Sequence, residues 1–161
     1  MAAILADTGL TVGRSTTQGA WIGDELLGVG DVAGGRMARH ILHDPAVQAG
    51  VFEFARGGML KHGMSLDGVD VGAVLNVLDQ HVGFDGVESR EDLAHVKGLL
   101  VRHARQAAVI NADDALCLAM RPHASAPLTL VSLRDDNPEV AAHLEAGGTA
   151  AWLAADGHLN L

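Results

Sequence analysis

One segment constrains the fold more than any other part of the chain. Residues 69–77 are nearly all apolar, so a strand formed by them would need cover on both faces. Strands of this kind are typical of parallel sheets, in which helices lie on both faces. Short apolar runs and helical stretches alternate along the rest of the sequence. The alternation predicts an α/β fold with a mostly parallel sheet and helices on both faces.

Capping and turn signals set the expected boundaries of the other elements. Ser89 and Asp92 have the spacing of a capping box, and Asn137 followed by Pro138 is typical of a helix start that Gly147 then closes. Asp156 and Gly157 predict a small β hairpin at the C-terminus. We expect helices at residues 2–7, 33–43, 89–104, 113–120 and 137–147, and strands at 10–15, 21–27, 51–54, 69–77, 107–111, 128–132, 149–153 and 158–161.

Length and composition limit the classes of protein. A chain of 161 residues supports one ordinary domain, so we expect residues 1–161 to form a single domain. The formal net charge of −9 works against binding to nucleic acid or to an anionic membrane. The single cysteine, Cys117, excludes an internal disulfide and a cysteine zinc cage, and it is expected to pack in the core. The sequence starts without a basic secretory signal and has no run of 18 apolar residues, which predicts a cytoplasmic protein.

Polar residues follow two of the expected strands, where open α/β sheets bind ligands. Glu53 and Arg56 stand beside two glycines, an arrangement that suits magnesium and a carboxylate or phosphate, or else a solvated ion pair. Asp79 and His81 follow the apolar segment 69–77. They suit a divalent cation beside a nucleotide, or else a histidine that closes its own loop by hydrogen bonds.

Other polar residues have simpler interpretations when each is taken alone. Lys97 reads as a solvated helix lysine, and helix capping explains the residues from Asn111 to Asp114. His40 and His43 share a helix face without a third ligand, so we expect them to be surface histidines.

A glycine motif offers one alternative function. Gly28, Gly30 and Ala33 fit G-x-G-x-x-A, and Glu53 follows at the end of the next strand, which is the pattern of a nicotinamide dinucleotide-binding module. The preceding strand is weak because Gly23, Asp24 and Glu25 interrupt it. The G-x-x-x-x-G-K-[ST] phosphate loop is absent from the sequence.

Seven stretches, taken together and in order, resemble the Mur ligase superfamily and most closely the Mur-ligase-like central domain of cyanophycin synthetases. They are residues 11–19, 30–39, 52–58, 76–83, 93–97, 109–114 and 136–148. The resemblance implies an ATP-dependent carboxylate–amine ligase, in which ATP phosphorylates a peptide carboxylate and an amine displaces the acyl phosphate. In that family the domain is associated with adding arginine to aspartate side chains of a polymer.

The resemblance also implies roles for individual residues. Glu53 and His81 would be magnesium ligands, and Lys97 would be a carbamylated lysine that supplies an anionic ligand to a second metal. The other matched residues would contact ATP or the amino-acid or peptide substrate: Asn76, Asn111 and Asp113 near the nucleotide, and Thr16, Thr17 and Arg56 facing the phosphate or carboxylate substrate.

Departures from the family pattern shape the remaining expectations. Gln18 and Gln80 stand where the family has aspartates, and Phe54 stands where it has a threonine. The family's phosphate-loop lysine would precede Met1, and its C-terminal and ATP-grasp domains are not found in the 161 residues. We therefore expect a truncated domain that is inactive alone, with an apolar sheet edge open to a second copy. The alternative is a non-catalytic relative that binds a full-length ligase or a regulatory nucleotide.

Overall fold

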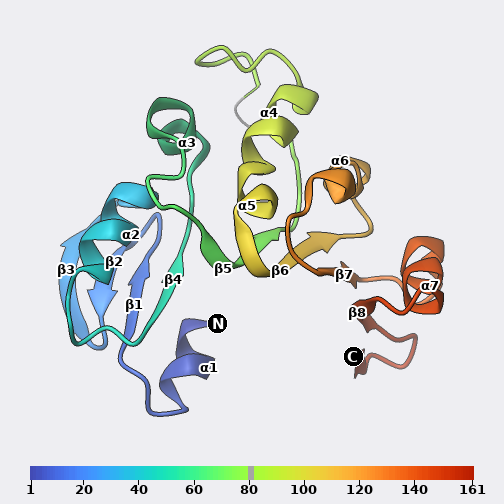
Figure 1. Ribbon diagram of the computed structural model, residues 1–161, viewed down its shortest axis with the longest axis horizontal. Coiled ribbons are helices and arrows are strands. Elements are labelled where there is room, and N and C mark those ends of the chain that lie inside the picture. The colour runs from blue at the N-terminus through green and yellow to red at the C-terminus, as the bar shows by residue number, and fades with distance from the viewer. Residues whose placement is uncertain (80–81) are drawn as a thin grey trace. The chain divides into compact units, whose positions relative to one another are not determined.

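The computed structural model describes residues 1–79 and 82–161, and within them the chain forms two compact units. The first unit comprises residues 1–66 and the second residues 67–161 (Figure 1). Each unit has a sheet of its own. The α/β class is confirmed, while the expectation of one domain over residues 1–161 stays a prediction.

The first unit contains a four-stranded sheet in the order β3-β2-β1-β4. The β1–β2 and β2–β3 pairs are antiparallel, and β1 and β4 are parallel. Ile41 of α2 is fully buried, and the missing side chain of Gly13 in β1 leaves room for it. The elements are α1 (Ala2–Ala6), β1 (Val12–Ser15), β2 (Gly19–Ile22), β3 (Glu25–Val29), α2 (Gly35–Leu42), β4 (Ala49–Phe52) and α3 (Arg56–His62).

Two parts of the first unit differ from expectation. The single strand expected at residues 21–27 is a hairpin of β2 and β3, because Gly23 has a φ of +54° and makes a two-residue turn with Asp24. The helix α3 was not predicted, since its seven residues include two glycines, which are poor helix formers.

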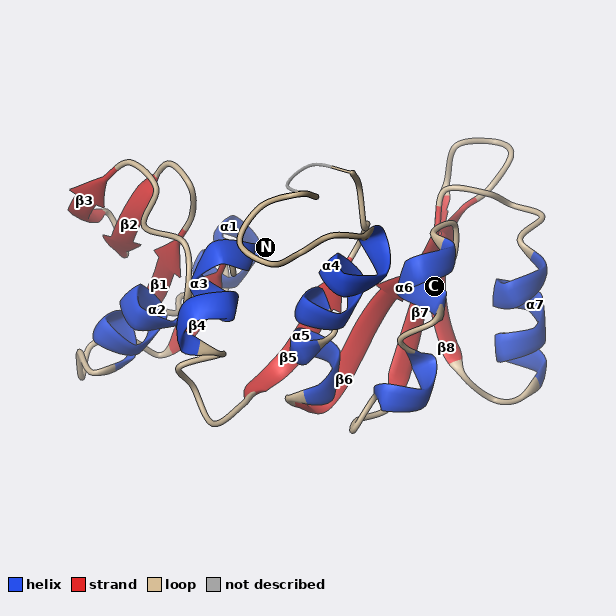
Figure 2. Cartoon of the chain, turned by 90° about the horizontal axis from the view of Figure 1, so that it is seen from above, coloured by secondary structure: helices blue, strands red, loops and turns tan. Residues whose placement is uncertain are grey.

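The second unit contains a five-stranded sheet in the order β5-β6-β7-β8-β9, with all pairs parallel except β8–β9. The mostly parallel sheet and the C-terminal hairpin are therefore confirmed. Figure 2 shows α5 beside β5 and β6, and α7 beside β8. The elements are β5 (Val69–Val74), α4 (Arg90–Lys97), α5 (Leu99–Arg102), β6 (Ala104–Asn111), α6 (Ala115–Leu118), a 3₁₀ turn (Arg121–His123), β7 (Leu128–Ser132), α7 (Pro138–Glu145), β8 (Thr149–Leu153) and β9 (Leu159–Asn160).

Strand β5 lies at one edge of its sheet, although its apolar sequence predicted cover on both faces. Gly72 and Val74 are buried, whereas Val71 is 57% exposed. The backbone of α5 covers the buried side so closely that a Cβ atom on Gly72 would collide with the Leu100 carbonyl. Of the strands in the part of the chain that the structure describes, only β6 pairs with β5.

The predicted caps are confirmed in the second unit. Ser89 and Asp92 form a reciprocal capping box at the start of α4, and Asn137 caps α7. The helix expected at residues 89–104 is divided at Gly98 into α4 and α5, and β6 begins at Ala104. None of the helices within residues 1–79 and 82–161 has both the length and the apolar character needed to cross a membrane.

Candidate functional site

Three predicted site residues come together at the ends of β1 and β4. These strands are parallel with Ser15 opposite Phe52, so Thr16 and Glu53 leave the sheet at the same edge. The backbone N–H of Thr17 donates a hydrogen bond to Glu53 Oε2 at 2.9 Å. The backbone N–H of Glu53 in turn donates to the Ser15 carbonyl at 2.9 Å. The carboxylate of Glu53 is thereby held over the start of the loop at residues 16–18, between β1 and β2, which we call the threonine loop.

The threonine loop holds its own shape. Thr16 Oγ1 accepts a hydrogen bond from the backbone N–H of Gln18 at 3.0 Å, and the N–H of Thr16 donates to the Gly19 carbonyl at 2.8 Å. Thr17 is exposed. A loop that satisfies its own backbone groups presents the Thr17 side chain to solvent, where a ligand can reach it.

The magnesium prediction concerns Glu53 and His81. Glu53 is exposed at a strand end and offers a carboxylate oxygen, the ligand type that magnesium prefers. His81 lies outside the described residues, so the pair stays a prediction. Within the described ranges there is no group of three or more His, Cys, Asp or Glu side chains that could hold a metal ion. Arg56, which was predicted to face substrate, is the first residue of α3 and is half-buried.

Asn76, Lys97 and Asn111 meet at the ends of β5 and β6 in the second unit. The Lys97 Nζ donates a hydrogen bond to the Asn76 carbonyl at 2.8 Å. Asn111 Nδ2 donates to the Leu75 carbonyl at 2.9 Å. Lys97 therefore connects α4 to the end of β5 and is not the freely solvated helix lysine of the simpler interpretation. The roles of these three residues toward a nucleotide or a metal stay predictions.

Asp113 is held by several hydrogen bonds at the same edge of the second sheet. Its carboxylate accepts from Ser132 Oγ at 2.7 Å, from the Leu133 N–H at 2.7 Å and from Asn137 Nδ2 at 2.8 Å. Burial acts to raise the pKa of Asp113, but these hydrogen bonds and the charge of Arg134 together lower it. Asp113 is thus an ionised anchor for the end of β7, and its contact with a nucleotide stays a prediction.

Asp114 joins two elements that the sequence did not connect. Its Oδ1 caps α6 through the N–H groups of Leu116 and Cys117, as its place in the sequence suggested. Its Oδ2 accepts from the Val77 N–H at 2.8 Å, and no sequence signal points to that contact. Burial acts to raise the pKa of Asp114, but the three backbone hydrogen bonds outweigh it and the pKa is lowered. One carboxylate thus fixes the loop after β5 against the start of α6.

Cys117 is fully buried in the core of the second unit, as predicted. Burial, followed by the charge of Asp114, raises the pKa of its thiol to about 12. A thiol in this state does not serve as a nucleophile near neutral pH.

The topology removes the context that the dinucleotide motif needs. Gly28 lies within β3, which pairs only antiparallel, with β2, among the described strands. A dinucleotide-binding turn requires a parallel strand–helix–strand unit. The glycines at 28 and 30 therefore belong to a hairpin strand and the loop after it, and the nicotinamide interpretation is wrong.

The fold is that of a Mur ligase. The solved structure of UDP-N-acetylmuramoyl-L-alanyl-D-glutamate–2,6-diaminopimelate ligase superposes on 84% of this chain and 29% of its own, with a TM-score of 0.66 and 23% sequence identity. That likeness concerns the fold alone, and it agrees with the class expected from the motifs. No family profile matches the sequence.

Sequence comparison then names the particular relative, which is cyanophycin synthetase. The chain is 37% identical to the enzyme of Geminocystis herdmanii over 163 aligned positions, which take in 100% of this chain and 18% of that protein. It is 41% identical to the enzyme of Crocosphaera subtropica over 92% of this chain and 17% of that protein. The chain is therefore homologous to a Mur-ligase-like segment of cyanophycin synthetase, as the motifs indicated. It spans less than a fifth of the length of these relatives.

Proposed function

We propose that this chain provides the central ATP- and magnesium-binding part of a carboxylate–amine ligase of the cyanophycin synthetase type. The observation that carries the proposal is the similarity to proteins named synthetases over the whole chain, at 37% identity to the enzyme of Geminocystis herdmanii. A ligase of known structure with the same fold supports it. The amine would be arginine and the acceptor a poly-aspartate chain, as the family resemblance implies.

The positions of the matched residues support this proposal. The Thr17 N–H donates a hydrogen bond to Glu53 at one strand end. At another strand end, Lys97 donates to the Asn76 carbonyl and Asn111 donates to the Leu75 carbonyl. Ligands of open α/β sheets bind at the carboxyl ends of strands. In each unit, taken by itself, these residues therefore lie on or beside the carboxyl ends of strands, where a ligand is expected.

Magnesium and ATP fit the chemistry of these residues. Glu53 would supply a hard oxygen ligand, Thr17 a hydroxyl and Arg56 a positive charge for a phosphate or carboxylate. When bound, ATP would supply the phosphoryl group that activates a carboxylate toward an amine, and magnesium would neutralise the charge of the phosphates. The protein's part is to position the reactants and stabilise charge, which provides most of the rate in phosphoryl transfer.

The 161 residues alone are expected to turn over no substrate. They contain no G-x-x-x-x-G-K-[ST] sequence, and a phosphate cradle is needed to place the transferred phosphoryl group. We also place the chain in the cytoplasm, where ATP is available.

A calorimetric titration of the purified chain with ATP, in buffer with magnesium, tests the proposal. Glu53→Gln and His81→Ala remove the two predicted metal ligands, and Glu25→Gln is a matched control because Glu25 is an exposed glutamate in β3. We expect magnesium-dependent binding that is weakened in the first two variants and kept in the control.

Two outcomes would overturn the proposal. The first is no heat at millimolar ATP, which would leave a non-catalytic partner of a ligase as the better interpretation. The second is ATP binding that Glu53→Gln and His81→Ala leave unchanged. A parallel assay for ADP release, with a poly-aspartate peptide and arginine, checks the expected lack of turnover.

A further inference from the structure

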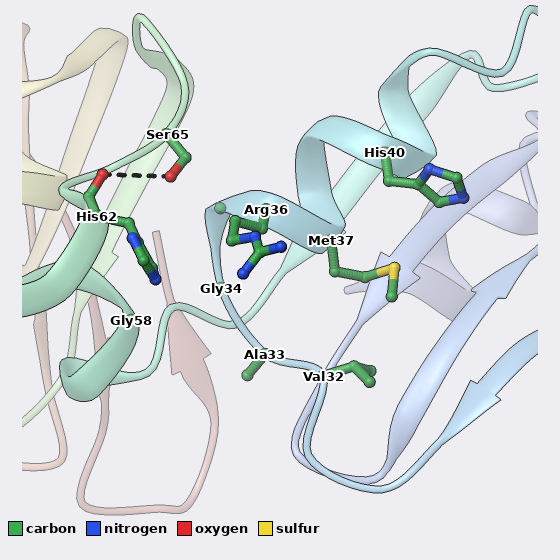
Figure 3. Close-up of a pocket in the computed structure, with 10 residues that line it drawn as sticks. Val32, Ala33, Gly34, Arg36, Met37, His40, Gly58, His62 and Ser65 are labelled. Atoms are coloured by element: carbon green, nitrogen blue, oxygen red, sulfur yellow. Dashed lines mark hydrogen bonds between the residues drawn. The ribbon is translucent and has the colours of Figure 1, made fainter.

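The first unit contains a pocket between α2 and α3 that none of the predicted site residues line. Its volume is about 570 Å³. Figure 3 shows the Arg36 guanidinium and the His62 imidazole extending from α2 and α3 into the space between them, and the Ser65 Oγ donating a hydrogen bond to the His62 carbonyl at 3.3 Å. The cationic, imidazole and apolar side chains of the pocket are compatible with several kinds of ligand, so its lining identifies no single one.

The second unit has a more specific arrangement at the end of β5, where side chains bind successive backbone groups. Pairing of β5 with β6 ends at Val74. Beyond that residue, Asn111 Nδ2 donates a hydrogen bond to the Leu75 carbonyl at 2.9 Å, and Lys97 Nζ donates to the Asn76 carbonyl at 2.8 Å. Side chains from β6 and α4 thus continue the hydrogen bonding of the strand after its partner strand has ended.

The backbone of Val77 is bound on both of its sides. Its N–H donates a hydrogen bond to Asp114 Oδ2 at 2.8 Å. Its carbonyl accepts two hydrogen bonds from the Arg90 guanidinium, from Nη2 at 2.7 Å and from Nε at 3.2 Å. The Arg90 Nε also lies 3.2 Å from Asp79 Oδ1. One guanidinium therefore joins the carbonyl of a fully buried residue to a carboxylate two positions later in the chain.

The stability of α4 gives no reason for an arginine at this position. Arg90 is the first residue of α4, directly after Ser89, whose capping box with Asp92 fixes the start of the helix. The N-terminal end of a helix carries partial positive charge, which disfavours a cation there. The Arg90 side chain is 46% exposed, and exposed ion pairs contribute little to stability. The hydrogen bonds to the Val77 carbonyl are therefore the main structural consequence of this arginine.

Asp114 acts on the same peptide from the opposite direction in the chain. Burial acts to raise the pKa of Asp114, but hydrogen bonds from backbone N–H groups and the charge of Arg90 lower it. Asp114 is therefore ionised at neutral pH. A carboxylate from the start of α6 and a guanidinium from the start of α4 together hold Val77, the residue that follows Asn76.

We propose that Arg90 is a positioning residue for ATP, which acts by fixing the backbone from which the side chain of Asn76 extends. This inference rests on the proposed function, because Asn76 is one of the residues expected near the nucleotide. Asn76 is exposed, and its side-chain amide has no hydrogen-bond partner within the part of the chain that the structure describes. A backbone that is already ordered spares a ligand the entropic cost of ordering it.

Calorimetric titration of the full chain with ATP and magnesium tests the proposal. Arg90→Met removes every donor and keeps an apolar stem, so we expect ATP binding to weaken about tenfold, as is usual when a group that orients a ligand-binding residue is lost. Arg90→Lys keeps one charged donor and should recover part of this loss. Arg121→Met is the matched control, because Arg121 is a partly exposed arginine of the same unit that pairs with Glu139 and makes none of these hydrogen bonds.

A double-mutant cycle separates positioning from a general loss of stability. If Arg90 acts through Asn76, the addition of Arg90→Met to Asn76→Ala should weaken ATP binding by less than about twofold beyond Asn76→Ala alone. Thermal unfolding without ATP shows whether each variant is folded. If Arg90→Met does not fold, Arg90→Lys takes its place in the same cycle.

Three results would overturn this role of Arg90 while the wild type still binds ATP, and so would leave the proposed function intact. They are unchanged ATP binding in the Arg90 variants, equal weakening by Arg90→Met and Arg121→Met, and independent effects of the Arg90 and Asn76 substitutions. A wild-type chain that binds no ATP would instead overturn the proposed function and this role together.

Discussion

The two units use charged side chains in different ways. In the second unit, Asp92, Asp113, Asp114 and Asp156 each accept hydrogen bonds from nearby backbone or side-chain donors, and the pKa of each is lowered. In the first unit, Arg36 faces a pocket with no carboxylate partner among the described residues. The carboxylates with a lowered pKa that hold backbone segments in place therefore lie in the second unit, whereas Arg36 of the first unit makes no ion pair among the described residues.

The cores of the units differ as well. A single cluster of 15 buried residues, from Val74 to Ala150, lies in the second unit. In the first unit the buried apolar residues are few, and Ile41 is the largest one that is fully buried. This contrast suggests that the second unit is the more stable scaffold, and the following experiments test that interpretation.

The largest expected effect comes from the second core. Leu130→Ala should lower the free energy of unfolding of the second unit by about 3 kcal/mol, because Leu130 is fully buried in β7 and the variant leaves a cavity. Ile41→Ala should cost the first unit about 2 kcal/mol, because fewer buried neighbours surround the cavity. Urea unfolding is followed by the fluorescence of Trp152 for the second unit and of Trp21 for the first, because each is the sole tryptophan of its unit. If each substitution changed the unfolding followed by Trp21 and by Trp152 equally, the contrast between the cores of the two units would be wrong.

The next effect concerns Asp114. Asp114→Ala should lower the free energy of unfolding by about 2 kcal/mol, since it removes a helix cap and leaves the Val77 N–H without its acceptor. Asp114→Asn keeps one acceptor oxygen and should cost less. Urea unfolding followed by Trp152 measures both. An alanine variant as stable as the wild type would show that the carboxylate does not anchor the loop after β5.

A smaller effect is expected from acid. Because the pKa values of Asp113 and Asp114 are lower in the folded state, their ionised forms stabilise the second unit at neutral pH. This stability is fully present above the ordinary carboxyl pKa and is lost as the pH falls through the lowered values. The free energy of unfolding should therefore decrease between pH 7 and about pH 3, and Asp114→Asn should make this decrease smaller. A variant with the same acid dependence as the wild type would contradict the assignment.

The smallest effect on stability is expected at the pocket of the first unit. Arg36→Gln should change the free energy of unfolding by less than about 0.5 kcal/mol, since the side chain is exposed and makes no ion pair among the described residues. Arg14→Gln is the comparison, because the Arg14 guanidinium lies 4.5 Å from the centre of the Trp21 ring. Thermal unfolding followed by Trp21 separates the two. A large loss in Arg36→Gln would mean that this residue is structural.

Local signals predicted much of the fold, and long-range pairing limited the rest. Ser89, Asn137 and the Asp156–Gly157 turn act over a few residues, so their caps and hairpin follow from the sequence. The edge position of β5 depends on which strands pair, which its apolar composition does not encode. The same holds for the candidate site. The motifs indicated Glu53 and Lys97. The hydrogen bond from Thr17 to Glu53, and the one from Lys97 to the Asn76 carbonyl, form only when segments distant in the sequence fold together.

The pocket residues were missed for a related reason. His40 was expected to be a surface histidine, and it is exposed, yet it also lines the pocket with His62 from a helix that was not predicted. The adjacent glycines at 34 and 35 were the available signal, because close approach to the Met64 carbonyl requires the second of them.

The burial of Cys117 makes the rate of its alkylation a measure of how often the second unit opens. Since it is the only cysteine and its thiol is both fully buried and held protonated, an alkylating reagent at neutral pH can modify it only when the surrounding core opens. The rate of labelling, read by mass, would thus report how often the second unit opens in the native state. A ligand that stabilises the second unit would slow the reaction, and the measurement needs no engineered cysteine.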